Sequence, residues 1–264
     1  MTVDSSKPLL QVQELGKTFS GQGGPWVLKN LSFSIGEGEF VTVIGPSGSG
    51  KSTLLNILCQ VDVPSEGSIL FRDRAIAGSG INSINPGLDG NIGYVTQEDN
   101  LLPWRTCLDN VLFPLEVQKT LTPQARRRAE GLMDAVGLKG FEKYYPHELS
   151  GGMRKRASLI RTLVYDPPVI LMDEPFGAVD AQTRIQLQAD LLNLWQQGRK
   201  TIIFITHDIS EAIALGDRTL VLSRGPARIA GEHVIDIPRP RNIHDVFSME
   251  AFPRLYAQIR AQVQ

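Results

Sequence analysis

The sequence predicts an α/β fold in which a parallel core sheet carries an N-terminal antiparallel β subdomain and an inserted α-helical subdomain. Three features predict this fold: alternating apolar and polar residues near the N-terminus, three short apolar segments further along, and a long helical interval between the first two of those segments. With 264 residues, the chain is long enough for one large α/β domain with a lobe.

The N-terminal part indicates antiparallel strands. Residues 9–19 (LLQVQELGKTF) and 26–35 (WVLKNLSFSI) alternate apolar and polar side chains, and the turn-forming segment SGQGGP lies between them. Because this alternation suits a sheet with one covered face, we expect a hairpin or a small antiparallel sheet here.

Three apolar segments indicate the core sheet. FVTVIG (residues 40–45), PVILMD (168–173) and TIIFITH (201–207) are short, almost wholly apolar and rich in β-branched residues. Such segments are typical of strands that are covered on both faces, as in a parallel α/β sheet.

The interval of residues 98–166 is polar and helical. In PQARRRAEGLMDAVGL, apolar residues recur at helical spacing, at Ala129, Leu132, Met133 and Val136. Because an insert of this size within a parallel sheet needs its own core, we expect a separate lobe. The predicted division is 1–97 for the core with its antiparallel part, 98–166 for the helical lobe, 167–240 for the rest of the core and 241–264 for a short helical tail.

The composition excludes several classes of protein. A formal net charge of −1 gives no general attraction to nucleic acid or to anionic lipid, so we expect no nucleic-acid partner. Cys59 and Cys107 lie far apart and outside any CxxC pattern, which speaks against a disulfide framework or a zinc site. No apolar run approaches the ~18 residues that span a bilayer.

GPSGSGKST matches the phosphate-loop pattern G-x-x-x-x-G-K-[ST], directly after the apolar FVTVI and before a helix-like stretch. The glycines let backbone N–H groups surround an oxyanion, Lys51 can reach the β and γ phosphates, and the Ser52 hydroxyl can bind Mg²⁺. A Gly-rich turn without a ligand is the alternative. The sequence predicts a P-loop NTPase whose nucleotide-binding loop comprises Gly45, Pro46, Ser47, Gly48, Ser49, Gly50, Lys51, Ser52 and Thr53.

PVILMDEP places two adjacent carboxylates at the end of an apolar segment, where a hydrolytic triphosphate site needs a metal ligand and a group that orients water. Successive side chains on a strand diverge, so the two carboxylates have different roles. We assign Asp173 to the Mg²⁺ and Glu174 to the attacking water, as the general base. The alternative is a charged strand end that faces solvent.

Two further polar residues follow strand-like segments, Gln97 after NIGYVT and His207 after TIIFIT. The carboxyl ends of parallel strands converge on the ligand crevice of an open sheet. We expect Gln97 to bind Mg²⁺ or the lytic water and His207 to hydrogen-bond the γ phosphate. Each residue has a structural role as its alternative.

In type and in order, these motifs resemble those of the nucleotide-binding subunits of ATP-binding cassette (ABC) transporters. The motifs are GPSGSGKST, Gln97, LSGG, ILMDEP, AVD and His207, and they span almost the whole chain. The resemblance implies an ATPase that converts ATP and water to ADP and phosphate, with Mg²⁺ as cofactor. It also implies a dimer, taken here to be a homodimer, in which each subunit completes the other's site.

The segment HELSGGMRKR has the residue types of an anion site without a neighbouring catalytic base. The resemblance identifies Ser150, Gly151 and Gly152 as the signature motif, which closes over the γ phosphate of ATP held by the second subunit. We expect a helix from about Met153 whose basic residues stay outside its buried face. The family more often has Gln where this chain has Met153.

Two further positions take their roles from the resemblance. Phe19 matches the aromatic residue that stacks on adenine, with Trp26 as the alternative, and either ring can instead belong to the core. Asp180 in GAVD matches the carboxylate of the loop that crosses the dimer interface. Asp180 can equally be the N-cap of a helix that begins in AVDAQTR.

QEDNLLPWRTCLDNVLFPLE, LSGGMRKRASLIRTL and RIAGEHVIDIPRPR resemble the importer branch for nitrate, sulfonate and taurine. This resemblance implies membrane permease subunits and a periplasmic or lipid-anchored binding protein as partners. It places the ATPase at the cytoplasmic face of the inner membrane. An exporter or lipoprotein-release ATPase is the alternative, followed by a soluble cassette ATPase without a transport role.

The segment LLPWRT (residues 101–106) places Leu and Trp beside Pro in the predicted helical lobe. In the family this region receives a helix of the permease, and an apolar groove is a known way to bind a helix. A local core is the other interpretation of Trp104 and its neighbours.

Overall fold

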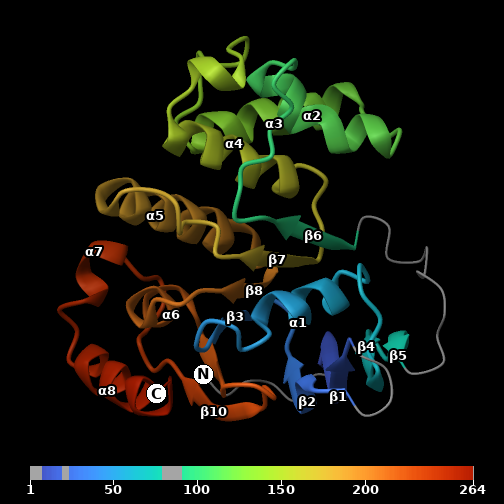
Figure 1. Ribbon diagram of the computed structural model, residues 1–264. Coiled ribbons are helices and arrows are strands. Elements are labelled where there is room, and N and C mark those ends of the chain that lie inside the picture. The colour runs from blue at the N-terminus through green and yellow to red at the C-terminus, as the bar shows by residue number, and fades with distance from the viewer. Residues whose placement is uncertain (1–7, 20–23, 79–90, 264) are drawn as a thin grey trace.

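The computed structural model describes residues 8–19, 24–78 and 91–263. Two sheets lie in its lower part and a helical lobe lies above them (Figure 1). Residues 20–23, the first four of the predicted SGQGGP turn, lie outside the described residues. The fold is the predicted α/β fold with a mainly parallel core sheet, an N-terminal antiparallel sheet and an inserted group of helices.

The antiparallel sheet has four strands in the order β2-β1-β4-β5. Its strands are β1 (Leu10–Thr18), β2 (Trp26–Ile35), β4 (Glu66–Phe71) and β5 (Arg74–Gly78). The two predicted segments pair as a hairpin, with Leu10 opposite Ile35 and Thr18 opposite Trp26. The last two strands follow the phosphate loop in the chain, and they were not predicted from the sequence.

The second sheet has six strands in the order β10-β9-β3-β8-β7-β6. Its strands are β3 (Phe40–Ile44), β6 (Ile92–Val95), β7 (Val169–Asp173), β8 (Thr201–Ile205), β9 (Arg218–Leu222) and β10 (Ile229–Val234). All neighbours are parallel except β10 and β9. The three apolar segments became β3, β7 and β8, and every residue of β3 and β8 is buried.

Apolar side chains cover both faces of this sheet. On one face, α1 (Lys51–Leu58) packs with the antiparallel sheet, and its buried side chains share a cluster with Val41 and Val43 of β3. On the other face, α5 (Ala181–Gly198) and α6 (Ile209–Leu215) share a cluster with Phe40 and Ile44. Alternate residues of β3 therefore face different helices, which explains why its sequence is apolar throughout.

The helical lobe has a third core of its own. Its helices are α2 (Cys107–Val117), α3 (Pro123–Ala135) and α4 (Gly151–Leu163), with the short 3₁₀ helix η2 (Pro146–Glu148) before α4. The predicted apolar positions of α3 lie in this core: Ala129 and Met133 are fully buried, and Leu132 packs beside them. Thr106, Thr122 and Ser150 cap the three helices by accepting a backbone N–H.

The signature helix begins at Gly151, near the predicted start at Met153, because Ser150 caps it. The expectation that its basic residues stay outside the buried face was wrong for Lys155 and Arg161. Lys155 is buried and donates to the carbonyl oxygen of Gln97, while Arg161 donates to the carbonyl oxygens of residues 99 and 100. These basic side chains do not stay outside because the segment after β6 lies along this side of the helix.

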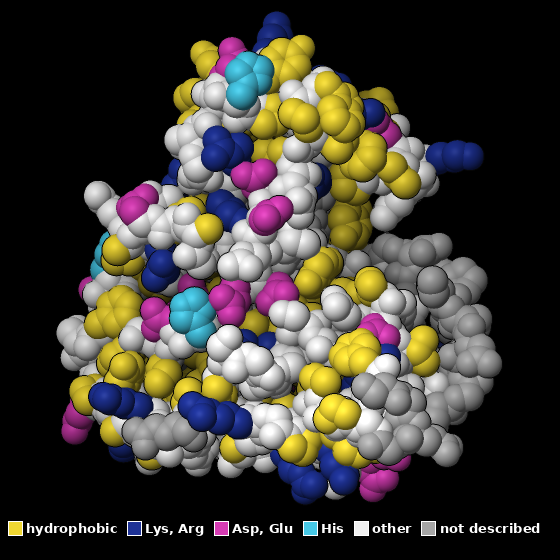
Figure 2. All heavy atoms as spheres, in the orientation of Figure 1, with side chains coloured by type: hydrophobic (Ala, Val, Ile, Leu, Met, Phe, Trp, Pro, Cys, Tyr) yellow, Lys and Arg dark blue, Asp and Glu magenta, His cyan; other side chains and the backbone are white. Residues whose placement is uncertain are grey.

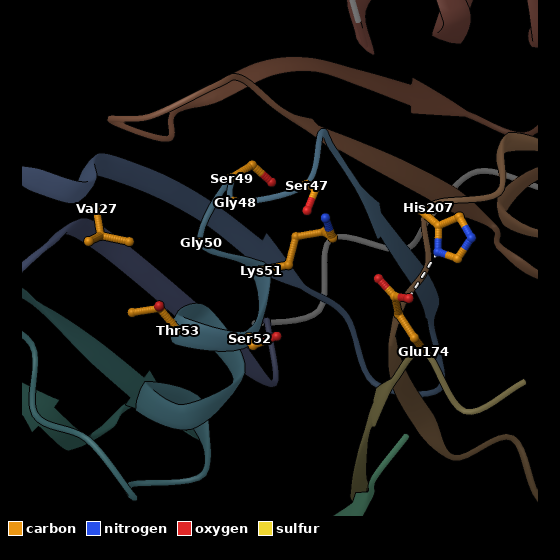
Figure 3. Close-up of a pocket in the computed structure, with 10 residues that line it drawn as sticks. All are labelled: Val27, Ser47, Gly48, Ser49, Gly50, Lys51, Ser52, Thr53, Glu174 and His207. Carbon is orange, nitrogen blue, oxygen red and sulfur yellow. Dashed lines mark hydrogen bonds and ion pairs between the residues drawn. The ribbon is translucent and has the colours of Figure 1, made fainter. Parts of the chain in front are cut away.

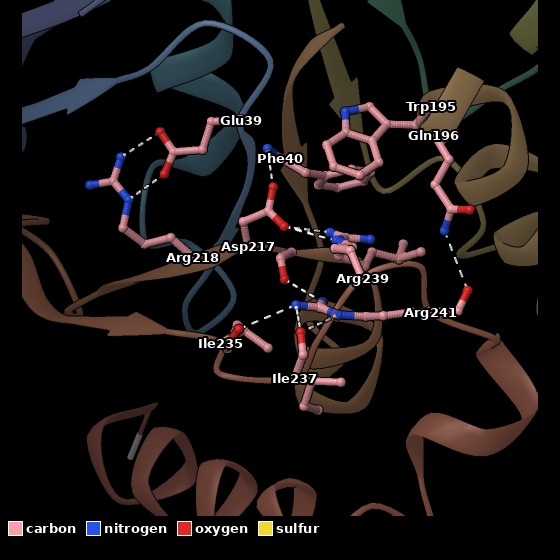
Figure 4. A network of polar contacts seen from close by, with 12 residues as sticks. Glu39, Phe40, Trp195, Gln196, Asp217, Arg218, Ile235, Ile237, Arg239 and Arg241 are labelled. Carbon is pink, nitrogen blue, oxygen red and sulfur yellow. Dashed lines mark hydrogen bonds and ion pairs between the residues drawn. The ribbon is translucent and has the colours of Figure 1, made fainter. Parts of the chain in front are cut away.

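The C-terminal segment is fastened to the core by two arginines (Figure 4). Arg239 pairs with Asp217 at 2.8 Å, and its guanidinium lies 4.3 Å from the ring centroid of Trp195. Arg241 is buried and donates to several backbone carbonyls, including that of Ile237. The remaining helices, α7 (Ile243–Val246) and α8 (Ala251–Val263), continue the core on this side.

Both cysteines are free, with Cys107 in the core of the lobe and Cys59 partly buried at the end of α1. None of the helices in the described ranges is both long enough and apolar enough to cross a lipid bilayer.

Candidate functional site

The phosphate loop runs from the end of β3 to the start of α1 and borders an open pocket (Figure 3). The pocket is lined by Val27, Ser47, Gly48, Ser49, Gly50, Lys51, Ser52, Thr53, Glu174 and His207. The loop therefore faces the end of β7 and the segment after β8. These elements adjoin because β3, β8 and β7 are neighbours in the sheet.

Two glycines give the loop its shape. Gly48 and Gly50 have φ values of 77° and 78°, in the left-handed region that favours glycine. Gly50 also packs against the antiparallel sheet, because a Cβ atom there would lie 2.6 Å from Cδ2 of Leu28. Gly50 is the N-cap of α1, so the free N–H groups of the first turn point toward the pocket.

Lys51 is the cation of the pocket. Its Nζ donates to the carbonyl oxygens of Gly45 at 2.9 Å and Pro46 at 3.0 Å. Burial lowers the pKa of Lys51, while the nearby carboxylates of Glu174 and Asp173 act in the opposite direction. The ammonium group is thus desolvated and held by neutral carbonyls, an arrangement in which an anionic phosphate is the stronger partner.

Asp173 is the last residue of β7. Burial raises the pKa of its carboxyl group, against the opposing effects of a hydrogen bond from Ser52 and one from the Tyr94 hydroxyl at 3.4 Å. Ser52 itself is exposed. A hydroxyl and a carboxylate are oxygen donors that suit Mg²⁺, which commonly takes one or two protein ligands and completes its shell with substrate phosphates. Within the described part of the chain, no group of three or more His, Cys, Asp or Glu side chains forms a metal cage.

Glu174 and His207 contact each other on the side of the pocket opposite the phosphate loop (Figure 3). Oε2 of Glu174 lies 2.9 Å from Nδ1 of His207 (Figure 3). Glu174 has a positive φ of 42°, and its backbone N–H donates to the carbonyl oxygen of Ile205 at 3.0 Å. A positive φ in a non-glycine residue is uncommon and tends to occur at functional sites. The residue is held in this conformation between two neighbouring strands.

Gln97 lies at the edge of this group. It does not border the pocket, but its amide nitrogen approaches Gly177, where a Cβ atom would lie 3.6 Å from Gln97 Nε2 and 3.8 Å from Glu174 Oε2. The backbone of Gln97 is held by Lys155 of the signature helix. The structure thus brings Gln97, Asp173, Glu174 and His207 to the carboxyl ends of adjacent strands.

The signature residues lie apart from the pocket of their own chain. Ser150 and Gly151 are exposed, and Ser150 accepts the N–H of Met153 at 3.3 Å. Gly152 lies so close to α5 that a Cβ atom would meet Cγ2 of Thr183 at 2.8 Å. None of the three borders the pocket.

Asp180 also lies outside the pocket. As expected from the sequence, it is the N-cap of a helix, α5, and accepts the N–H of Thr183 at 3.0 Å. Hydrogen bonds from the backbone N–H and the side chain of Thr183 lower the pKa of this carboxyl group. Asp180 is also exposed, so its cap role and a role at an interface are compatible.

The two candidate aromatic residues differ in exposure. Phe19 follows the end of β1 and is 63% exposed, whereas Trp26 is half-buried and packs over Gly16. Phe19 is therefore not a core residue. Trp104 in the lobe is 71% exposed while Leu101 is buried, so the local-core interpretation is wrong for Trp104 and right for Leu101.

Exposed hydrophobic side chains gather on the lobe (Figure 2). The large exposed hydrophobic residues of the lobe are Trp104, Val117, Leu121, Tyr144 and Tyr145. Next to Trp104, Arg105 is fixed by Glu116 at 2.6 Å and lies 5.0 Å from the Phe113 ring centroid. The roles of Arg105, Tyr94 and Lys155 were not predicted from the sequence, because each depends on a contact between distant segments.

A sequence model of the ABC transporter family matches residues 28–177, which include the phosphate loop, the signature segment and both carboxylates. The chain belongs to the ABC transporter family. It is an ATP-binding subunit of this family and an ATPase, as the sequence predicted.

Two curated relatives of this ABC subunit match along most of their length. The nitrate transport protein NasD of Klebsiella oxytoca is 41% identical over 89% of this chain and 88% of its own. The aliphatic sulfonates import ATP-binding protein SsuB of Bacillus cereus is 41% identical over 88% of this chain and 89% of its own. The predicted resemblance to the nitrate and sulfonate branch is confirmed.

The ABC cassette fold is also found among solved structures. A dimeric structure of the ATP-binding cassette MJ0796, in a post-hydrolysis state bound to ADP and Pi, has a TM-score of 0.73 and 32% sequence identity. The match covers 87% of this chain and 100% of that chain.

Proposed function

We propose that this ABC subunit hydrolyses ATP to power the import of a small anion such as nitrate or a sulfonate, including taurine. Support comes from NasD and SsuB, whose names state nitrate transport and sulfonate import and which are each 41% identical to this chain. An ABC exporter or lipoprotein-release ATPase is the second candidate, since the motifs of the ATP site are common to all of these systems.

Within the site, the phosphate loop and Lys51 bind the phosphates, while Ser52, Asp173 and Gln97 hold Mg²⁺. The bound ion would neutralise phosphate charge. The oxygen donors of Ser52 and Asp173 already lie together through their hydrogen bond, so few side chains need to move. Phe19 is the adenine-stacking residue in this assignment, because its ring is the more exposed of the two candidates.

Glu174 is the general base that takes a proton from the attacking water. His207 donates its Nδ1 hydrogen to Glu174 Oε2 in the resting site and turns the carboxylate toward the loop. In the nucleotide-bound state, His207 also hydrogen-bonds the γ phosphate.

The working form is a dimer in which Ser150, Gly151 and Gly152 contact the ATP of the partner. Support comes from the exposure of Ser150 and Gly151 and from the absence of all three residues from the lining of the pocket of the same chain. The N-terminus of α4, with its free N–H groups, is suited to a phosphate oxygen. Asp180, at the start of α5, contacts the partner at the same interface. The similar MJ0796 cassette was solved as a dimer.

The partners are two membrane permease subunits, which meet the lobe near Trp104, and a periplasmic or lipid-anchored binding protein that supplies the anion. The ATPase then lies at the cytoplasmic face of the inner membrane. We also propose the division of the chain given by residues 1–97 and 167–240 for the nucleotide-binding core, 98–166 for the signature lobe and 241–264 for the tail.

The contact of Glu174 with His207 opposite a phosphate loop carries the hydrolysis part of this proposal. The similarity to NasD and SsuB carries the import part. Transport is tested in a bacterial strain that lacks its own nitrate and sulfonate import ATPases. The chain is expressed there with the permease and binding protein encoded beside it, as wild type and as Glu174→Gln. We expect uptake of ¹⁵N-nitrate or of taurine with the wild type alone. If the cells take up neither compound but export a labelled one, the result would favour the second candidate.

A further inference from the structure

We propose that Lys17 is a positioning residue for adenine recognition, which holds the Phe19 ring and polarises it so that its free face stacks on the base. This inference rests on the proposed role of Phe19 as the adenine-stacking residue. It adds a residue outside the motifs to the ATP site.

Lys17 is a buried cation placed against an exposed ring. The residue is only 8% exposed, and its ammonium group binds the carboxylate of Asp62 and donates to the carbonyl oxygen of Val63 at 2.7 Å. The same Nζ lies 4.8 Å from the ring centroid of Phe19. The ammonium group of Lys17 is therefore held in place, and the exposed Phe19 ring packs against it.

The backbone on which Phe19 stands is also fixed. The N–H of Thr18 donates to Ser65 Oγ at 3.1 Å, and the N–H of Ser65 donates to the carbonyl oxygen of Gly16 at 2.8 Å. Lys17 and Thr18 are thus tied to residues 62–65 by side-chain and backbone contacts. Phe19 follows directly, so its place is determined before any nucleotide binds.

This end of β1 lies beside the phosphate pocket. Lys17 is paired with Leu28 of β2, and the neighbouring Val27 lines the pocket. Gly50 of the phosphate loop approaches Leu28 and Val27 so closely that a Cβ atom would lie 2.6 Å and 3.1 Å from them. The base of a nucleotide held by the loop can therefore reach Phe19 at the end of β1.

A cation near an aromatic ring has two effects on stacking. It holds the ring by attraction to the π electrons, and it draws electron density toward itself. The ring then presents a poorer π face to an electron-rich purine, which favours stacking. The ring is also ordered in the absence of ligand, so less conformational entropy is lost when the base binds. Together these effects predict about a 3- to 10-fold gain in ATP affinity.

The structure offers a matched control. Lys29 Nζ lies 5.7 Å from the ring centroid of Trp26, on the neighbouring strand β2. Lys29 thus makes the same kind of contact as Lys17, but with Trp26, the aromatic residue that we do not assign to adenine. Lys29→Met therefore measures how ATP affinity changes when a lysine is removed from an aromatic ring elsewhere in this sheet.

The experiment measures dissociation constants by isothermal titration calorimetry on the full-length chain. The ligands are MgATP and inorganic tripolyphosphate, which has the phosphates without the base. The variants are Lys17→Met, Phe19→Ala, the double variant and Lys29→Met, with Lys17→Arg as a rescue that keeps the charge. We expect Lys17→Met to weaken ATP binding about 3- to 10-fold without changing tripolyphosphate binding. We expect Lys17→Arg to keep most of the wild-type affinity for ATP.

The double variant shows whether Lys17 acts on ATP affinity through the Phe19 ring or by stabilising the fold in general. If Lys17 acts through the ring, Lys17→Met has no further effect once Phe19 is Ala. A loss that persists in the Phe19→Ala background, or that appears equally with tripolyphosphate, overturns the proposal. If Lys17→Met does not fold, Asp62→Asn, which removes the anchor of the ammonium group, is expected to give a smaller loss confined to ATP. Unchanged ATP binding in that variant is then the contradicting result.

The outcomes also separate this inference from the proposed function. Unchanged ATP affinity in Lys17→Met with weakened affinity in Phe19→Ala refutes the role of Lys17 alone. Unchanged affinity in Phe19→Ala refutes the assignment of Phe19, and a loss in Lys29→Met instead would assign the base to Trp26.

Discussion

Nδ1 of His207 lies 2.9 Å from Oε2 of Glu174, so the two side chains form one unit opposite the phosphate loop. They come from neighbouring strands, with Glu174 after β7 and His207 after β8. The histidine therefore holds the carboxylate in place, and a substitution of His207 tests what this contact contributes to hydrolysis.

Replacing His207 by Ala should lower kcat by about 10²-fold, because the carboxylate of Glu174 loses the partner that orients it. ATP affinity should stay within a few fold, since Lys51 and the loop N–H groups remain. The measurement is phosphate release at saturating MgATP together with calorimetric ATP binding. His233→Ala is the matched control, because His233 also makes a 2.9 Å contact, with Gln262, but does not border the pocket. Wild-type kcat in His207→Ala would remove this residue from the mechanism.

Lys51→Ala should abolish measurable ATP binding. The ammonium group is the side-chain cation that the loop places at the phosphates, and the alanine variant leaves the loop with backbone N–H and hydroxyl donors. Equilibrium binding of a fluorescent ATP analogue checks this. Lys139→Ala, which removes an exposed lysine paired with Asp134, should bind as the wild type does. Equal affinity of Lys51→Ala and wild type would contradict the phosphate-loop assignment.

Asp173→Asn should stabilise the nucleotide-free protein while it abolishes Mg²⁺-dependent hydrolysis. Burial raises the pKa of Asp173 above its ordinary value of 3.8, so ionisation of this group costs folding free energy. The cost is absent below the unfolded pKa and complete above the folded pKa. The Tm of Asp173→Asn should therefore exceed that of the wild type at pH 7, by about 2–4 °C per kcal/mol gained.

The sign of the pH dependence makes the Asp173 prediction specific. The difference in Tm should shrink as the pH falls from 7 toward 4, because the wild-type carboxyl group then becomes neutral as well. Thermal unfolding followed by circular dichroism at several pH values measures it. A difference that grows toward pH 4 would mean that the folded state favours the charged form of Asp173.

Trp104→Ala should weaken binding to the permease and leave ATP binding unchanged. Removing a large aromatic residue from the centre of an interface commonly costs about 2 kcal/mol or more. Trp104 is exposed and does not border the phosphate pocket, so the fold and the ATP site should tolerate the change. Co-purification with the permease measures it, and Phe247→Ala removes an exposed aromatic from the C-terminal part of the chain as a control. Equal recovery of both complexes would separate Trp104 from the permease interface.

The features that the sequence predicted are those with a local cause. The segments that became β3, β7 and β8 are apolar because helices cover both faces of the sheet. The phosphate loop needs glycine where φ is positive, at Gly48 and Gly50, and this need leaves a fixed pattern. The N-cap role of Asp180 is also readable, because a cap depends only on the next few residues.

The features that the sequence did not predict depend on contacts between distant segments. The placement of β3 between β9 and β8 joins segments that lie far apart in the chain and leaves no periodic signal. Lys155 and Arg161 look like solvated residues of an amphipathic helix until residues 97–100 are known to lie beside them. Lys17 becomes notable for the same reason, when Asp62 and Phe19 are found around its ammonium group.

The central claim is that the signature residues of one subunit complete the ATP site of another. The measurement is the molar mass of four proteins by size-exclusion chromatography with multi-angle light scattering, with and without MgATP. The proteins are the wild type, Glu174→Gln, Ser150→Arg and the double variant. Glu174→Gln should bind ATP, lose hydrolysis by about 10²-fold or more and accumulate as a dimer with ATP.

Adding Ser150→Arg to Glu174→Gln should return the ATP-bound protein to the mass of a monomer, because the bulky side chain would occupy the phosphate site of the partner. ATP binding to that monomer should persist, since Ser150 does not border the pocket of its own chain. A double variant that binds ATP and still elutes as a dimer would contradict the account.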